Sequence, residues 1–308
     1  MLSYILLLGI GFIWGSQFLF TQMALVTMSP MTVAASRIII GAMTLILLVA
    51  LLPKRETKAA FSPIKLSWVK TCLWYAAIAL FEAIIPFFSM AWGQQYLASS
   101  IAAVLVSTVP IFTAIFVGLL IRQEPITFGV LVSVIGGFIG ILILFWPSLQ
   151  QIDVTQLIPQ FAILLAAASF ALALVLIRLF PEPVTPLVMT RNVLGFAAIP
   201  FVIYLGVHSS MIMQQYSWAS FIAVMVLGIF CSGLVYMMYV TLIYQQGASF
   251  AALSNYFVPL FGAVLGVIIL NEPLHARLVI ALLVVFIALG ISRCAWLSKP
   301  LFSRQAER

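Results

Sequence analysis

The sequence predicts an all-α integral membrane protein with ten transmembrane helices, arranged as two inverted five-helix repeats. Three observations carry this prediction. The 308-residue chain is 65% hydrophobic and only 7% charged, with a mean hydropathy of +1.24, whereas a soluble domain carries about 25% charged residues. Apolar runs of membrane-spanning length fill most of the chain. A motif in the first half returns in the second half.

Ten apolar runs are long enough to cross a bilayer, because its core of about 30 Å needs roughly 20 helical residues. In chain order they cover about 3–24, 33–52, 68–93, 98–121, 127–146, 157–180, 184–207, 217–243, 248–270 and 276–296. The first run lacks a preceding basic segment and a cleavage site, so we expect it to be a retained transmembrane helix. Loops are short, and the longest runs from Pro53 to Ser67.

The positive charges predict the orientation of these helices. With a cytoplasmic N-terminus, eleven basic side chains fall inside and Arg277 alone falls outside, which is the distribution that membrane insertion favours. The eleven are Lys54, Arg55, Lys58, Lys65, Lys70, Arg122, Arg178, Arg293, Lys299, Arg304 and Arg308. We therefore expect a multi-pass protein of a bacterial-type inner membrane with both termini cytoplasmic. The net charge of +7 is spread over short loops, which argues against a nucleic-acid partner.

Two motifs recur in the same order. Ser100, Ala102, Ala103, Val109 and Pro110 match Ser249, Ala251, Ala252, Val258 and Pro259. Arg37 with Gly41, and Arg191 with Gly195, share the spacing Arg-x-x-x-Gly. Because five helices is an odd number, a second copy enters the membrane from the opposite side. Residues 1–150 and 151–308 are therefore expected to be related by a pseudo-two-fold axis in the membrane plane, around a midplane site.

The paired Ala-Ala…Pro…Glu-Pro helices end at Glu124-Pro125 and Glu272-Pro273, and Trp14-Gly15-Ser16 lies in the first helix. With ten helices as five plus five, this pattern resembles the EamA-type family of the drug/metabolite transporter superfamily. The resemblance covers essentially the whole chain. It implies a bundle around a central cavity, with the fourth, fifth, ninth and tenth helices more structural or on a dimer-forming side. It also implies cargo such as amino acids, amines, nucleosides or cationic drugs, often moved outward.

Glu82 lies near the middle of the third run, four residues before Pro86. A carboxyl at mid-bilayer costs at least about 2.5–3.5 kcal/mol, so we expect it to face the bundle interior or water. Burial favours its protonated form, which suits a proton-coupling group. An anchor for a substrate ammonium is the second functional interpretation. A protonated carboxyl or an Arg partner that holds helices together is the structural one.

Arg37 and Arg191 stand about seven residues into their helices. Facing inward, either could hold a substrate carboxylate or pair with Glu82, and a guanidinium opposite a carboxylate would suit a zwitterion. Alternatively, each side chain could extend to its nearer interface. Three prolines, Pro86, Pro110 and Pro259, each remove a helical hydrogen bond and free a carbonyl, so they are candidate hinges or fixed kinks.

Polar and aromatic side chains within the apolar runs are candidates for the cavity wall. Besides Glu82 and the two arginines they are Trp14, Gln17, Tyr236, Tyr239, Asn255 and Tyr256. An amide inside a membrane needs a partner, so Gln17 and Asn255 are expected to bond another group. Packing in the core is the alternative for each aromatic ring.

Enzymatic function and cofactors are not expected. His208 and His275 lie in loops without converging acidic or thiol ligands, and the chain has no phosphate loop, nucleotide fingerprint or nucleophile elbow. Cys72, Cys231 and Cys294 fit no metal pattern and are expected to be buried thiols.

The sequence therefore predicts a secondary transporter that exports small organic metabolites, such as amino acids or amine-like compounds, by alternating access. It is expected to act as a monomer or homodimer, in contact with membrane lipid and a small-molecule substrate. An importer or exchanger of cationic or nucleoside-like substrates is the alternative.

Overall fold

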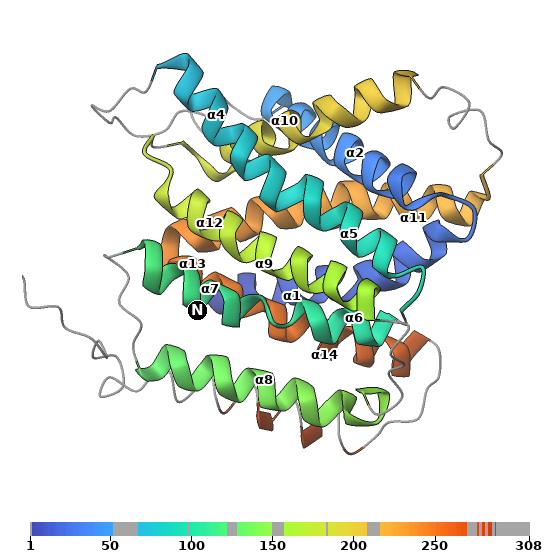
Figure 1. Ribbon diagram of the computed structural model, residues 1–308, viewed down its shortest axis with the longest axis vertical. Coiled ribbons are helices and arrows are strands. Elements are labelled where there is room, and N and C mark those ends of the chain that lie inside the picture. The colour runs from blue at the N-terminus through green and yellow to red at the C-terminus, as the bar shows by residue number, and fades with distance from the viewer. Residues whose placement is uncertain are drawn as a thin grey trace, which may run out of the picture.

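The computed structural model describes residues 2–51, 67–97, 99–121, 128–149, 157–182, 184–207 and 216–269, together with six isolated positions between 276 and 287. Throughout these residues the regular secondary structure is helical (Figure 1). Seven helical spans are long and apolar enough to cross a membrane: Ser3–Leu25, Pro30–Leu51, Trp68–Gly93, Ile101–Leu120, Leu157–Leu179, Pro186–Val207 and Trp218–Gln246. The prediction of an all-α, multi-pass membrane protein is thus confirmed.

The first part of the chain forms a series of helices that follow the predicted apolar runs. In order they are α1 (Leu2–Leu25), α2 (Pro30–Leu51), α4 (Trp68–Ala79), the π-helical turn η1 (Leu80–Ile84), α5 (Ile85–Gly93), α6 (Ser99–Val106), α7 (Val109–Leu120) and α8 (Phe128–Leu149). The third predicted run is therefore the continuous unit α4–η1–α5. The fourth run is divided into α6 and α7.

The second part forms a similar series of helices. It comprises α9 (Leu157–Leu179), α10 (Pro186–Val207), α11 (Trp218–Gly228), the π-helical turn η4 (Ile229–Leu234), α12 (Val235–Gln246), α13 (Ala248–Ala252) and α14 (Ser254–Ile269). The eighth predicted run is the continuous unit α11–η4–α12, and the ninth is divided into α13 and α14. The tenth predicted run, about 276–296, lies outside the described residues except for isolated positions.

The two π-helical turns sit near the middle of long helical units. In η1, the N–H of Ile85 bonds the carbonyl of Leu80, five residues back, and the next residue, Pro86, has no N–H to donate. In η4, the N–H of Val235 bonds the carbonyl of Phe230 in the same way. Such turns widen a helix locally and occur often at functional sites.

Proline also marks the two divided helices. Pro110 lies near the N-terminus of α7, after a turn at Ser107 and Thr108. The apolar run 98–121 predicts one helix with Pro110 near its middle. Instead the helix is interrupted just before Pro110, because the proline ring clashes with the carbonyl four residues back. Pro259 lies inside α14, and the interruption at Leu253 comes earlier.

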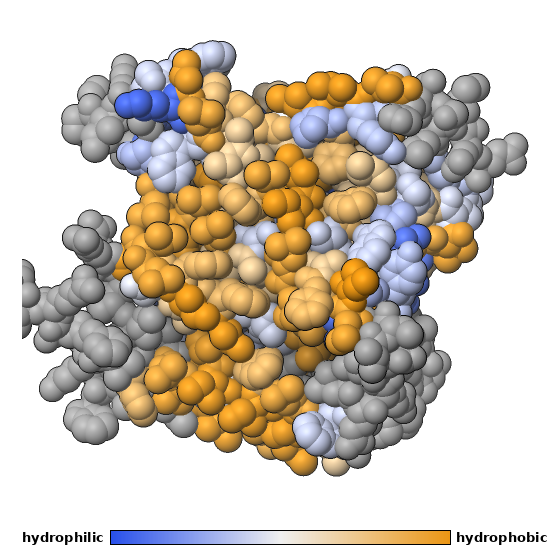
Figure 2. Space-filling model, in the orientation of Figure 1, coloured by the Kyte–Doolittle hydropathy of each residue, from blue (hydrophilic) through white to orange (hydrophobic). Residues whose placement is uncertain are grey.

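Glycines let the central helices approach one another closely. A Cβ at Gly15 of α1 would lie 2.8 Å from the carbonyl oxygen of Val258 in α14, so only glycine permits this contact. At the periphery large apolar side chains are exposed, among them Phe12, Leu119, Phe161, Ile203 and Ile222. In Figure 2 apolar side chains cover most of the visible face, as expected for a surface in contact with lipid tails.

Candidate functional site

A cavity lies at the centre of the bundle, where η1 and η4 meet α1, α9 and α12. Twelve residues from nine elements line it: Trp14, Gln17, Glu82, Phe87, Val106, Phe170, Leu194, Cys231, Ser232, Tyr236, Tyr239 and Asn255. Its volume is about 20 Å³, measured as the space open to the centre of a water-sized sphere, which is roughly what one water needs. The cavity is therefore narrow in this conformation.

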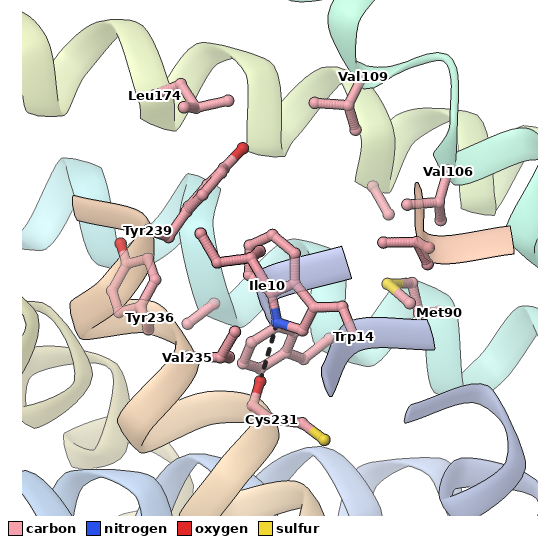
Figure 3. Packing of buried hydrophobic residues seen from close by; sticks show 14 of the residues in the cluster. Ile10, Trp14, Met90, Val106, Val109, Leu174, Cys231, Val235, Tyr236 and Tyr239 are labelled. Carbon is pink, nitrogen blue, oxygen red and sulfur yellow. Dashed lines mark hydrogen bonds between the residues drawn. The ribbon is translucent and has the colours of Figure 1, made fainter. Parts of the chain in front are cut away.

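The η4 turn presents its backbone to the cavity. The carbonyl oxygen of Cys231 accepts hydrogen bonds from Nε1 of Trp14 at 3.1 Å and from Nη2 of Arg37 at 3.3 Å. In Figure 3 the indole of Trp14 lies between this carbonyl and the ring of Tyr239, with ring centroids of Trp14 and Tyr239 4.6 Å apart and edge to face. The widened turn thus holds Trp14 in the cavity wall and Arg37 behind it.

Arg37 lies just behind the wall and is almost completely buried. Its Nε donates to Oγ of Ser232 at 3.0 Å, and its Nη2 donates to Oε1 of Gln17 at 3.2 Å. The guanidinium carbon lies 3.8 Å from the centroid of the Phe87 ring, a cation–π geometry. Arg37 therefore links α2 to α1, η4 and α5, using neutral partners.

Small residues bring α2 close enough for these bonds. A Cβ at Gly228 would lie 2.5 Å from Cβ of Ile40, and one at Gly41 would lie 3.0 Å from Cβ of Ser232. Gly233 packs against Thr44 in the same interface. The sequence of η4 thus sets the position of the buried guanidinium.

Glu82 is the acidic side chain of the cavity and is 2% exposed. Its Oε2 has no hydrogen-bond partner, and neither does the buried hydroxyl of Tyr236. Glu82, Tyr236 and Tyr239 all line the cavity, so these three polar groups border the same space. In the described residues Glu82 and Arg37 form no salt bridge, although both are buried.

The two amides have different partners. Gln17 accepts from Arg37. Asn255 donates through Nδ2 to the hydroxyl of Tyr239 at 3.3 Å and to the carbonyl of Ala252 at 3.1 Å. Both amides therefore hold cavity-wall groups in place, which satisfies the expectation that an intramembrane amide is bonded.

Two predicted site residues lie elsewhere. Arg191 is half-buried on α10, and both its Nε and its Nη2 donate to Oδ1 of Asn192, at 2.9 and 2.6 Å. Tyr256 is fully buried, and its hydroxyl donates to the carbonyl of Val134 in α8 at 2.6 Å. Neither side chain lines the cavity. Of the predicted hinges, Pro86 is the second residue after η1, whereas Pro110 and Pro259 belong to the divided helices.

Sequence reasoning missed several residues of the wall. Phe87 and Phe170 are apolar residues in apolar helices, so nothing in the pattern set them apart. Ser232 could have been found, because it occupies in η4 the place that Glu82 occupies in η1. Cys231 is buried as predicted, but it also lies at the site, where its carbonyl bonds Trp14. Cys72 is only half-buried.

An apolar helical bundle with a buried carboxyl, tyrosines and amides around one central cavity defines a multi-pass membrane protein with an internal polar site. The pattern of the EamA-like transporter family matches residues 1–146 and 157–293. The chain therefore belongs to this family and is a transporter, as its sequence motifs indicated.

Two curated relatives are similar over most of their length. One, "Uncharacterized transporter YoaV" of Bacillus subtilis, is 20% identical over 91% of this chain and 92% of its own. Another, "Uncharacterized transporter" of Archaeoglobus fulgidus, is 24% identical over 86% of this chain and 89% of its own. A solved crystal structure at 17% identity superposes with a TM-score of 0.71, over 94% of this chain and 96% of the other, which shows a shared fold.

Proposed function

We propose that this transporter exports small organic metabolites, amino acids or amine-like compounds, by alternating access, and that Glu82 exchanges protons during the cycle. The observation that carries the proposal is the unpartnered Oε2 of Glu82 in a central cavity. A carboxyl in the middle of a membrane is expensive to keep and is typically found on ion or substrate pathways. Glu82 is therefore the group through which the driving ion acts.

The chain is proposed to contain two inverted five-helix repeats, residues 1–150 and 151–308. The helix contacts support this arrangement, because they occur in pairs. In the first pair, α1 packs on α11, α12 and α14, and α9 packs on α4, α5 and α7. In the second pair, α2 packs on α11 and η4, and α10 packs on α4 and η1. The family pattern also matches two segments of similar length. Two related halves around a shared site are the architecture of many alternating-access transporters.

The narrowness of the cavity fits one step of such a cycle. Since the space holds about one water, a metabolite enters only when the halves separate. The π-helical turns η1 and η4 flank the cavity and lack the regular hydrogen-bond pattern of an α-helix. They are the proposed bending points, with Pro86 setting the position of the first.

The sign of the proton coupling gives the direction of transport. If a substrate and a proton compete for one carboxyl, each inward proton is exchanged for one outward substrate. Because the proton gradient of a bacterial-type inner membrane is directed inward, this exchange results in export.

Both termini are proposed to be cytoplasmic.

The test uses the purified full chain in liposomes loaded with radiolabelled amino acids or amines. Acidifying the outside should accelerate efflux of at least one compound from wild-type vesicles. Glu82→Gln should abolish this acceleration, whereas exchange of labelled for unlabelled compound at equal pH should persist at saturating concentrations of the compound. The matched control is Glu182→Gln, because Glu182 contacts Thr71 outside the cavity. Efflux no faster than from protein-free liposomes for every compound, or unchanged pH dependence in Glu82→Gln, would overturn the proposal; proton-driven uptake would favour the importer.

A further inference from the structure

We infer that the central cavity binds the ammonium group of an organic amine that carries no carboxylate, with Glu82 as its counter-ion and the hydroxyl of Tyr236 as a second acceptor. This inference rests on the proposed transport function and narrows its substrate class. From the sequence, Arg37 and Glu82 together were compatible with both amino acids and amines as substrates. The structure favours amines.

Two buried oxygens at the cavity have no hydrogen-bond partner. Oε2 of Glu82 and the hydroxyl of Tyr236 lie on η1 and α12, and both residues are more than nine-tenths buried. Buried polar atoms are normally hydrogen-bonded, so two unpartnered ones facing one space indicate a missing donor. An ammonium supplies three N–H donors and a positive charge.

Aromatic rings also line the cavity and favour a cationic ligand. Rings of Trp14, Phe87, Phe170 and Tyr239 line the same space. Cations are attracted to aromatic faces, most strongly to that of Trp. Arg37 already occupies one face of Phe87, which shows that this environment holds a cation without a carboxylate beside it.

The guanidinium and indole donors near the cavity are already bonded, so they are not free to receive a substrate carboxylate. Arg37 does not line the cavity, and three of its N–H groups bond Ser232, Gln17 and the Cys231 carbonyl. The indole N–H of Trp14 bonds that same carbonyl. An amino acid would bring a second carboxylate close to Glu82 with few free donors to receive it, and burying a poorly solvated charge is costly.

The test compares matched triplets that share a side chain: phenethylamine, phenylalanine and 3-phenylpropionate; tryptamine, tryptophan and indole-3-propionate; isoamylamine, leucine and 4-methylvalerate. Binding to the detergent-purified full chain is measured by thermal stabilisation over a concentration series, since a ligand of the folded state raises its stability by mass action. In at least one triplet the amine should bind at least tenfold more tightly than the amino acid, and the acid should bind no more tightly than the amino acid.

Variants assign the effect to the two oxygens. Glu82→Gln should weaken amine binding at least tenfold, and Tyr236→Phe should weaken it severalfold. Tyr236→Phe removes a single hydroxyl, so it remains informative if Glu82→Gln does not fold. Glu182→Gln and Tyr96→Phe, which alter a carboxyl and an exposed tyrosine away from the cavity, should bind the amine as the wild type does.

Several results would overturn the inference. These are an amino acid that binds as tightly as its amine in every triplet, no stabilisation by any amine, or amine affinity unchanged in both site variants. Exchange assays in liposomes distinguish failure of the amine-binding inference from failure of the transport proposal. Amines that bind but are never moved would refute transport and leave the binding site standing. Amino acids that are exchanged while their amines are not would refute the amine site and leave transport standing.

Discussion

The interface of α2 with η4 and the interface of α10 with η1 contain the same Arg-x-x-x-Gly spacing but are packed differently. At the first, Arg37 is buried and bonded across to η4, and a Cβ at Gly41 would lie 3.0 Å from Cβ of Ser232. At the second, Arg191 is half-buried and bonded within its own helix, and a Cβ at Gly195 would meet nothing within 4 Å. One interface is tight and the other is loose.

The neighbouring residues explain the difference. Asn192 follows Arg191 and binds its guanidinium, whereas the apolar Ile38 follows Arg37 and cannot. Gly228 and Gly233 flank the middle of η4 and allow α2 to pack closely against it. The unit from Trp68 to Ala91 contains no glycine that would allow α10 to pack as closely. Asymmetry between the two interfaces is what the proposed alternating-access cycle would require in any single conformation.

The largest expected effect is that of removing the guanidinium from the tight interface. Arg37→Gln should lower the free energy of unfolding by about 3 kcal/mol or more, because Ser232, Gln17 and the Cys231 carbonyl lose a buried charged donor. Arg191→Gln should change it by no more than about 0.5 kcal/mol. Thermal unfolding of both purified variants measures the difference.

Arg37→Lys serves as the control for charge. A lysine ammonium cannot reach three partners in a planar arrangement, so this variant should remain destabilised. Equal losses in Arg37→Gln and Arg191→Gln would contradict the asymmetry between the two interfaces.

Alanine at the two glycines should have effects of opposite sign. Gly41→Ala should destabilise by about 1–3 kcal/mol, because the added methyl pushes α2 away from Ser232 and the Gly228 carbonyl. Gly195→Ala should stabilise by up to about 1 kcal/mol, because alanine favours a helix and has free space there. Denaturation curves of the pair test this, and a shared sign would mean that the two interfaces do not differ in packing.

The sequence was sufficient for much of the fold, since a lipid solvent leaves few choices of spanning structure. Runs such as 68–93 and 157–180 match helical units almost to the residue. The π-helical turns were not predicted, because an i to i−5 bond depends on the packing around it. Pro86 and the glycines of η4 were the local signals for them.

The candidate site was predicted in part. Glu82, Trp14 and Gln17 line the cavity, because a polar or indole group in an apolar helix must find a partner inside the protein. The same reasoning could not separate them from Arg191 or Tyr256, which find partners in an adjacent side chain and a backbone carbonyl. Residue type indicates that a partner is needed, but the tertiary fold decides which partner it is.

The smallest expected effect concerns the serines that precede α4 and α11, the helices that lead into η1 and η4. Ser67 and Ser217 have nearly the same backbone angles, φ −64° and ψ 148° against φ −66° and ψ 148°. Only Ser217 caps its helix, accepting from the N–H of Ser220 at 3.1 Å. Ser217→Ala should therefore cost about 1 kcal/mol, and Ser67→Ala a few tenths at most. Equal costs in thermal unfolding would show that the α11 end is held by packing rather than by its cap.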